Sequence, residues 1–148
     1  MGQEDVHQWM SEIGPLLGLG EVIEYPGEAL WIIVFQDGQV LEAEYDAPGE
    51  RLLLSMDLGA PQAGEAAALH RLLLQYNHSW RQTGGVHMAL AGDNAVQMLA
   101  LAGPSLERQT LARALAGLHA NAALWRALLT PPPPGADAAS PDPHALRV

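Results

Sequence analysis

The chain has 148 residues, a length that suits one domain with its own core, and it has no cysteine, which excludes disulfides and cysteine-ligated zinc. Its formal net charge is −10 at pH 7, and residues 1–60 hold twelve of the acids but only one base, Arg51. This acidic half disfavours nucleic acid and anionic membrane as partners, and it is compatible with a basic protein partner or with a role in solubility alone.

The N-terminal segment MGQEDVHQW is acidic and has no apolar core, so we expect no signal peptide. No apolar run reaches the roughly 18 residues that a membrane span needs. We therefore expect a cytoplasmic protein that does not insert into membranes.

A first helix is predicted over residues 4–20, where Trp9 and Ile13 fall on one apolar face. Pro15 removes a backbone donor and should kink or restart this helix. Gly18 should help to end it, because glycine readily adopts the left-handed conformation found after helices.

Three strands are predicted next, over residues 30–35, 40–45 and 51–58. The first two are joined by Gln-Asp-Gly-Gln, and Asp-Gly between apolar segments is a strong hairpin signal. In the third strand, Leu52 and its alternate neighbours are all apolar, whereas the other parity is mixed. The first strand, LWIIVF, is apolar on both parities, so its second face needs cover from a helix, a second subunit or a ligand.

A second helix is predicted within residues 59–85, with Pro61 in its first turn and Gly84 as its left-handed C-terminal residue. A second hairpin over 86–101 and a long helix over 106–129 follow. The order α-β-β-β-α-β-β-α indicates an α+β fold with one antiparallel sheet packed by helices. We expect one domain over residues 1–130 and a Pro/Ala-rich disordered tail over 131–148.

Several stretches in this order resemble the class I chaperones of bacterial type III secretion, the Tir-chaperone (CesT) family. They are LLGLG after the first helix, the block LWIIVFQDGQVLEAEYDAPGERLLLSMDLGAP, and the block LLLQYNHSWRQTGGVHMALAGDNAVQMLALAG. The most specific piece is the Thr-Gly-Gly between a leucine-rich helix and a hairpin.

The resemblance implies a bacterial homodimer that binds the N-terminal segment of a secreted effector in extended form, without ATP, and keeps it soluble and secretion-competent. The effector would contact grooves formed by the first helix and the three-stranded meander, and the expected contacts are Leu16, Leu17, Ile33, Phe35, Leu52 and Leu54. The expected dimer interface comprises Leu73, Tyr76, Trp80, Val86, Met88 and Leu90. The alternative is a dimeric adaptor or regulator that binds a folded partner with the same fold.

An enzyme is disfavoured because no HExxH, phosphate-binding glycine loop or GxSxG motif is present. His70 and His78 are separated by more than two helical turns, about 12 Å of rise, which is too far for two ligands of one metal. We therefore expect no catalytic residues, no metal and no cofactor.

Overall fold

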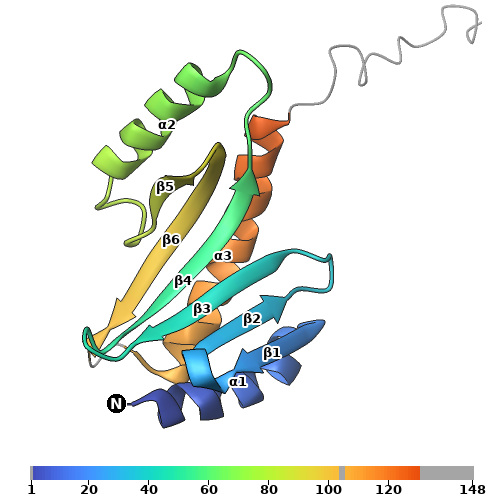
Figure 1. Ribbon diagram of the computed structural model, residues 1–148, viewed down its shortest axis with the longest axis vertical. Coiled ribbons are helices and arrows are strands. Elements are labelled where there is room, and N and C mark those ends of the chain that lie inside the picture. Colours follow the sequence, from blue (N-terminus) through green and yellow to red (C-terminus); the bar gives the residue numbers. More distant parts are fainter. Residues whose placement is uncertain (1, 104–105, 131–148) are drawn as a thin grey trace, which may run out of the picture.

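The computed structural model describes residues 2–103 and 106–130, which form a six-stranded antiparallel sheet and three α-helices (Figure 1). The strand order across the sheet is β1-β2-β3-β4-β6-β5. The elements in chain order are α1 (Gln3–Leu17), β1 (Glu21–Tyr25), the 3-10 helix η1 (Pro26–Glu28), β2 (Leu30–Val34), β3 (Val40–Asp46), β4 (Arg51–Gly59), α2 (Ala66–His78), β5 (His87–Ala91), β6 (Asn94–Ala102) and α3 (Arg108–Leu129).

The α+β class, the antiparallel sheet and both predicted hairpins are confirmed. The predicted element order is wrong in one respect, because a further strand, β1, follows the first helix and pairs with β2 along its whole length. Its sequence, EVIEY, has neighbouring apolar residues between two acids rather than a clean alternation, so the pattern did not stand out. The predicted tail, residues 131–148, lies outside the described residues.

The helix boundaries correct two further predictions. Helix α1 continues through Pro15 to Leu17, so the proline does not restart it, and Gly18 follows with a left-handed φ of 59° as expected. Helix α2 is shorter than predicted and begins only after Gly64, whose φ of 88° is incompatible with a helix. Pro61 therefore precedes α2, and Gly84, although left-handed, lies in the turns beyond it.

The helices pack on one face of the sheet, which we call the helix-covered face; α3 crosses behind the strands in Figure 1. The side chains of β3 and β4 that point to this face are buried, and those between them are not, as the period of two requires. Helix α2 lies beside β5, and its Tyr76 packs edge-on against Trp125 of α3, with ring centroids 5.3 Å apart. The core includes Val6, Met10, Ile13, Trp31, Ile33, Leu41, Leu52, Leu54, Met56, Leu111, Leu115 and Leu118.

One buried polar side chain fixes α3 on the sheet. Gln97 of β6 is fully buried and donates a 2.6 Å hydrogen bond to the carbonyl of Leu118, in the middle of α3. Its side-chain oxygen accepts a 2.9 Å bond from Asn121, one turn further along the helix. Because an unpaired buried amide is costly, these bonds select one position of α3 along β6.

The opposite face of the sheet, which we call the open face, carries no helix of the described residues. Strand pairing places Ile23, Ile32 and Glu42 side by side on it, and Tyr25, Leu30 and Glu44 in the next row. The apolar side chains here are half-buried or exposed. The second apolar parity of β2 is therefore left without cover inside the described chain.

Replacing Gln97 by methionine tests the anchor of α3. We expect Gln97→Met to lower the free energy of unfolding by about 1–3 kcal/mol, because the bonds to Leu118 and Asn121 are lost while the volume is nearly kept. Urea unfolding followed by circular dichroism measures this. Gln109→Met is the control, because Gln109 is an exposed residue of α3, and it should leave the free energy of unfolding nearly unchanged. Equal losses of stability in the two variants would contradict the anchor.

An ion pair between α1 and α3 predicts a pH dependence. Arg108 donates to Glu12 at 2.5 Å, and this bond is the main reason that the pKa of Glu12 lies below its ordinary value of 4.5. The contribution to stability is therefore full above the unfolded pKa and is lost as pH falls through the lower, folded pKa. Between pH 5 and pH 3 the urea midpoint of Glu12→Gln should fall less than that of the wild type. Glu4→Gln is the control, because Glu4 has no side-chain partner among the described residues, and it should follow the wild type.

Candidate functional site

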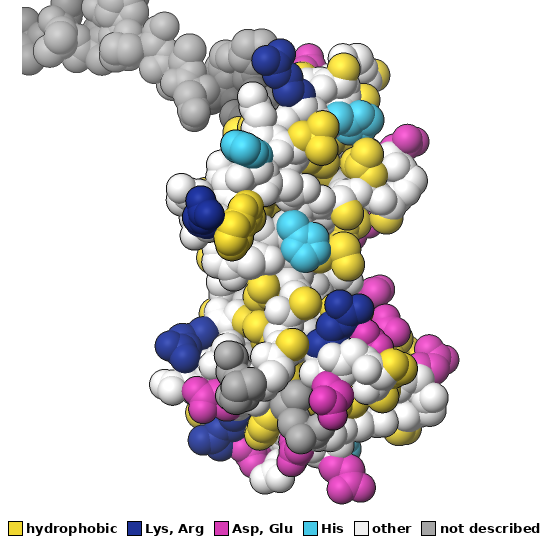
Figure 2. Space-filling model, turned by 90° about the vertical axis from the view of Figure 1, so that its left-hand side faces the viewer, with side chains coloured by type: hydrophobic (Ala, Val, Ile, Leu, Met, Phe, Trp, Pro, Cys, Tyr) yellow, Lys and Arg dark blue, Asp and Glu magenta, His cyan; other side chains and the backbone are white. Residues whose placement is uncertain are grey.

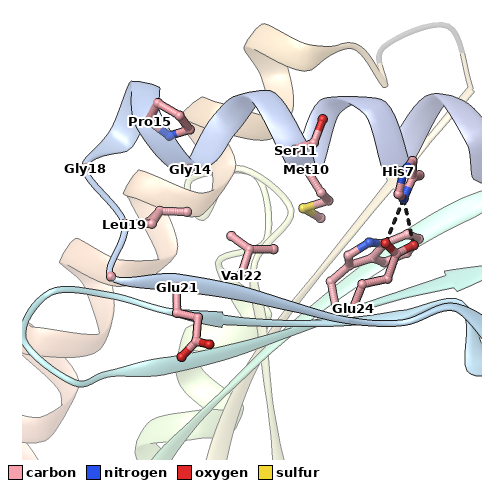
Figure 3. Close-up of a pocket in the computed structure, with 12 residues that line it drawn as sticks. His7, Met10, Ser11, Gly14, Pro15, Gly18, Leu19, Glu21, Val22 and Glu24 are labelled. Atoms are coloured by element: carbon pink, nitrogen blue, oxygen red, sulfur yellow. Dashed lines mark hydrogen bonds and ion pairs between the residues drawn. The ribbon is translucent and has the colours of Figure 1, made fainter.

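A groove runs between α1 and β1 on the helix-covered side of the sheet edge. Its volume is about 500 Å³, and Figure 3 shows Met10 of α1 and Val22 of β1 pointing into it toward each other. Gly14 widens the groove, because a β-carbon at this position would come within 3.9 Å of the Val22 side chain. The missing side chain leaves room for one from another molecule.

One end of the groove is closed by a contact between a histidine and a glutamate, and the groove lining contains an unpaired polar atom. His7 Nδ1 lies 2.8 Å from the Glu24 carboxylate, which joins α1 to β1 (Figure 3). Trp31 of β2 also lines the groove and is 1% exposed, and its Nε1 has no hydrogen-bond partner among the described residues. An unpaired buried N–H is unusual and calls for an explanation, such as a partner absent from the free chain.

The two edges of the sheet differ in their readiness to accept another strand. At the β5 edge, Asn77 of α2 accepts a 2.7 Å bond from the Met88 N–H and donates a 2.9 Å bond to the Met88 carbonyl. The outer edge of β1 has no such cover from a described residue, since β1 pairs only with β2. An uncovered edge strand presents backbone donors and acceptors to which an extended peptide can add.

The six side chains expected to contact an effector do not lie together on a surface. Leu16 is 65% exposed and Leu17 is half-buried, both at the end of α1. Ile33, Phe35, Leu52 and Leu54 point to the helix-covered face and are buried in the core. In the free chain these four side chains belong to the core, and the contact of all six residues with an effector stays a prediction.

The residues expected in a dimer interface are divided in the same way. Leu73 and Met88 are buried between α2 and β5, and Tyr76 and Val86 are half-buried. Trp80, in the turns after α2, is 63% exposed, and Leu90 of β5 is 45% exposed. Leu74 of α2, which the sequence did not single out, is also exposed. We call the exposed trio Leu74, Trp80 and Leu90 the α2–β5 surface.

A second hollow lies between α2 and α3. It has a volume of about 620 Å³ and is lined by Leu72 and Tyr76 of α2 and by Leu124, Trp125 and Leu128 of α3. Most of these lining side chains are apolar, as are the exposed side chains of the α2–β5 surface.

The acids of the molecule gather at the other end. Figure 2 shows most acidic side chains in the lower part of the molecule, where Figure 1 places α1 and the meander. Asp37 is held by the Gln39 N–H and by His119, and Asp46 by Arg51 and the Gly49 N–H, so the pKa of each carboxyl is lowered. Glu21, Glu42 and Glu44 on the open face, by contrast, have no partner among the described residues.

The histidines form no metal site in the described part of the chain. His119 stacks on Phe35 at a centroid distance of 4.0 Å and contacts Asp37, His7 contacts Glu24, and His87 contacts a backbone carbonyl. No three potential ligands among the described residues come close enough to hold one ion. Across the same residues, no helix has the length and apolar content needed to cross a bilayer.

Sequence reasoning missed the residues that shape the groove, namely His7, Met10, Gly14, Val22, Glu24 and Trp31. A signal for β1 was available, because Val22, Ile23 and Tyr25 are strand-favouring types bounded by Gly20 and Pro26. No pattern in the sequence could have shown that α1 leaves a gap over this strand.

A one-layer sheet with helices on a single face, a free edge strand and an apolar groove beside that edge defines a small polypeptide-binding module. The family model of the Tir chaperone protein (CesT) family matches residues 11–126. The chain therefore belongs to the Tir chaperone protein (CesT) family.

Solved structures share this fold. The chain is similar to one in the crystal structure of the ExsC-ExsE complex, with a TM-score of 0.72 and 20% identity over 86% of this chain and 95% of that one. It is similar to one in the HopA1-SchA chaperone-effector complex, with a TM-score of 0.67 and 17% identity over 84% and 94%. An uncharacterized protein from Methanothermobacter thermautotrophicus has a TM-score of 0.53 and 15% identity over 86% and 95%. Among proteins of curated function, no sequence matches significantly.

Proposed function

We propose that this protein is a cytoplasmic, ATP-independent type III secretion chaperone that binds the N-terminal segment of a secreted effector and keeps it soluble and secretion-competent. Membership of the chaperone family supports this function, as does the similarity to a chain from a chaperone-effector complex. The observation that carries it is the free edge of β1 beside the apolar groove under α1. These features suit an extended client, as we call the bound effector segment.

The client would add to β1 as a seventh strand. Its backbone would bond to the free edge, and alternate side chains would point into the groove and onto the open face. Ordering a disordered segment costs about 2–5 kcal/mol or more, whereas each backbone hydrogen bond contributes only about 0.5–1.5 kcal/mol net. Several apolar anchors are therefore needed, and Met10, Val22, Ile23 and Leu16 are available to receive them.

The protein would act by binding its client and would not catalyse a reaction. The strongest cluster of polar side chains at the groove, His7 with Glu24, is a paired and solvent-exposed contact. Such a contact holds α1 against β1, and its two side chains are not buried, unlike the groups typical of catalytic sites. We therefore assign the protein no catalytic residues and no cofactor.

We also propose that two copies pair through the α2–β5 surface. Leu74, Trp80 and Leu90 are large apolar side chains that stay exposed on α2, on the turns after it and on the neighbouring strand β5, and exposed apolar side chains on neighbouring elements favour a protein interface. A two-fold dimer would bury the same patch on each subunit. This arrangement would leave both β1 edges free for a client.

The groove can be tested by filling it. Gly14→Met should abolish capture of the client, because the new side chain would occupy the space between α1 and Val22. Gly14→Ala should keep it and should gain up to about 1 kcal/mol of stability from its higher helix propensity. The measurement is affinity purification of the tagged chaperone from its own host, with identification of the bound secreted protein and of its protease-protected segment.

The same experiment separates the chaperone from an adaptor of the same fold. A chaperone should protect an extended N-terminal segment of a secreted protein. A folded partner domain whose capture is indifferent to Gly14→Met would contradict the proposal and favour the adaptor.

The proposed dimer can be tested by its mass in solution and by substitutions in its interface. Light scattering should give twice the 15.8 kDa of one chain. The double change Trp80→Glu, Leu90→Glu should yield monomers, because it places four carboxylates in the paired interface. Leu16→Glu, at the far end of the molecule and 65% exposed, should leave the mass unchanged. A wild-type monomer at micromolar concentration would rule out the pairing.

A further inference from the structure

We infer that the client segment bound at β1 is a cationic strand, with basic side chains opposite Glu21 and Glu24 and apolar side chains opposite Val22, Ile23 and Tyr25. This inference rests on the proposed function and names the chemistry of its substrate. It follows from the sequence of the free edge strand and from the charges around it.

The first step is the imbalance of charge around the edge. Within residues 1–60 the only base is Arg51, and its Nε lies 2.7 Å from Asp46. Three basic side chains of α3 contact this half of the chain: Arg108 contacts Glu12, His119 contacts Asp37, and Arg126 donates to the backbone carbonyl of Asp57. No base among the described residues pairs with Glu21, Glu42 or Glu44, so their charge is free to attract an external cation.

The second step is where these free acids sit. Glu21 ends the row Glu21, Val34 and Val40 on the open face, and Glu42 and Glu44 follow Ile32 and Leu30 in the next rows. Figure 3 shows the Glu21 side chain pointing away from α1, on the side of the sheet opposite the groove. Every free carboxylate on this face therefore has an apolar cross-strand neighbour. A partner that is both apolar and cationic matches this surface, whereas a purely apolar or an acidic partner does not.

The third step is the register that the edge imposes. Residues directly opposite each other on paired strands share a face, and pairs of opposite charge or of apolar side chains stabilise the pairing. On the open face, Glu21 favours a base and Ile23 and Tyr25 favour apolar residues. On the groove face, Val22 favours an apolar residue and Glu24 favours a base, which would take over the carboxylate from His7.

The resulting pattern is basic-apolar-apolar-basic-apolar, read from Glu21 to Tyr25. It applies to a parallel client in this direction and to an antiparallel client in reverse. A core with an apolar residue added before the first base is palindromic and satisfies both directions. The free edge strand thus specifies the charge pattern of its client without fixing the client's direction.

Three peptides with this core test the inference on the full-length protein. The cores are valine–arginine–valine–valine–arginine–valine, the same with glutamine for arginine, and the same with glutamate, each with glycine-serine flanks and a fluorophore. Fluorescence anisotropy at low salt should rank the arginine peptide first, about 2- to 30-fold tighter than the glutamine peptide, from two cross-strand charge pairs. The advantage should shrink at 0.5 M salt, where charges are screened within a few ångströms.

Charge reversal of the edge strand provides the matched variant. Glu21→Arg with Glu24→Arg should reverse the ranking and bind the glutamate peptide best. Glu4→Arg with Glu50→Arg changes the net charge equally at exposed positions outside the site, and it should keep the wild-type order. If both double variants lose the ranking alike, net charge alone decides and the register inference is wrong. Circular dichroism confirms that each variant is folded.

The possible failures are distinguishable. If the three peptides bind the wild type equally and Gly14→Met abolishes their binding, the groove and the proposed function stand and the charge pattern falls. If no peptide binds, strand addition at β1 is wrong, and the charge pattern falls with it. If the wild type still captured a secreted protein and Gly14→Met did not, the proposed chaperone function would nevertheless stand.

Discussion

Helical cover on only one face of a sheet that is apolar on both is the constraint from which the other features follow. In β2, Trp31 and Ile33 are buried beneath the helices, while Leu30, Ile32 and Val34 face the other way. The described chain has no further helix to place over them. The surface can therefore be completed only from outside, and the free edge of β1 at its border offers backbone groups for the same purpose.

The groove depends on how firmly the helices are held at the sheet. Gln97 fixes α3 by bonding to a carbonyl within the helix, and α3 in turn holds α1 through Arg108 and Glu12. The far side of α1 is tied to the sheet by His7 and Glu24. Beyond both attachments, toward the C-terminal end of α1, Gly14 leaves a gap that no side chain of the helix fills. A rigid support with one unfilled position lets a flexible partner bind without rebuilding the core.

Local patterns in the sequence predicted much of the fold, and long-range packing accounts for what they missed. The parity of Leu52, Leu54 and Met56 and the Asp-Gly turn depend on neighbours in the chain, and both were predicted correctly. Strand β1 was missed because its acids interrupt the apolar pattern, although those acids are what distinguish it as an edge. The predicted contacts Ile33 and Phe35 lie in the core, because apolar character alone cannot say which face of a strand the helices cover. The groove arises from α1, β1 and β2 together, and no single segment encodes it.

The amide of Asn77, bonded to both backbone groups of Met88, has a consequence for the size of the assemblies this sheet can form. A sheet open at both ends could be a link in an endless polymer, with each added strand exposing a fresh edge for another molecule. Because Asn77 occupies the backbone groups of Met88 at the β5 edge, we expect added strands to pair only at β1. Strand addition at β1 stops after one client strand, provided that the outer edge of the client does not pair with further strands. A client carrying arginine or lysine meets that condition, because like charges repel its own copies.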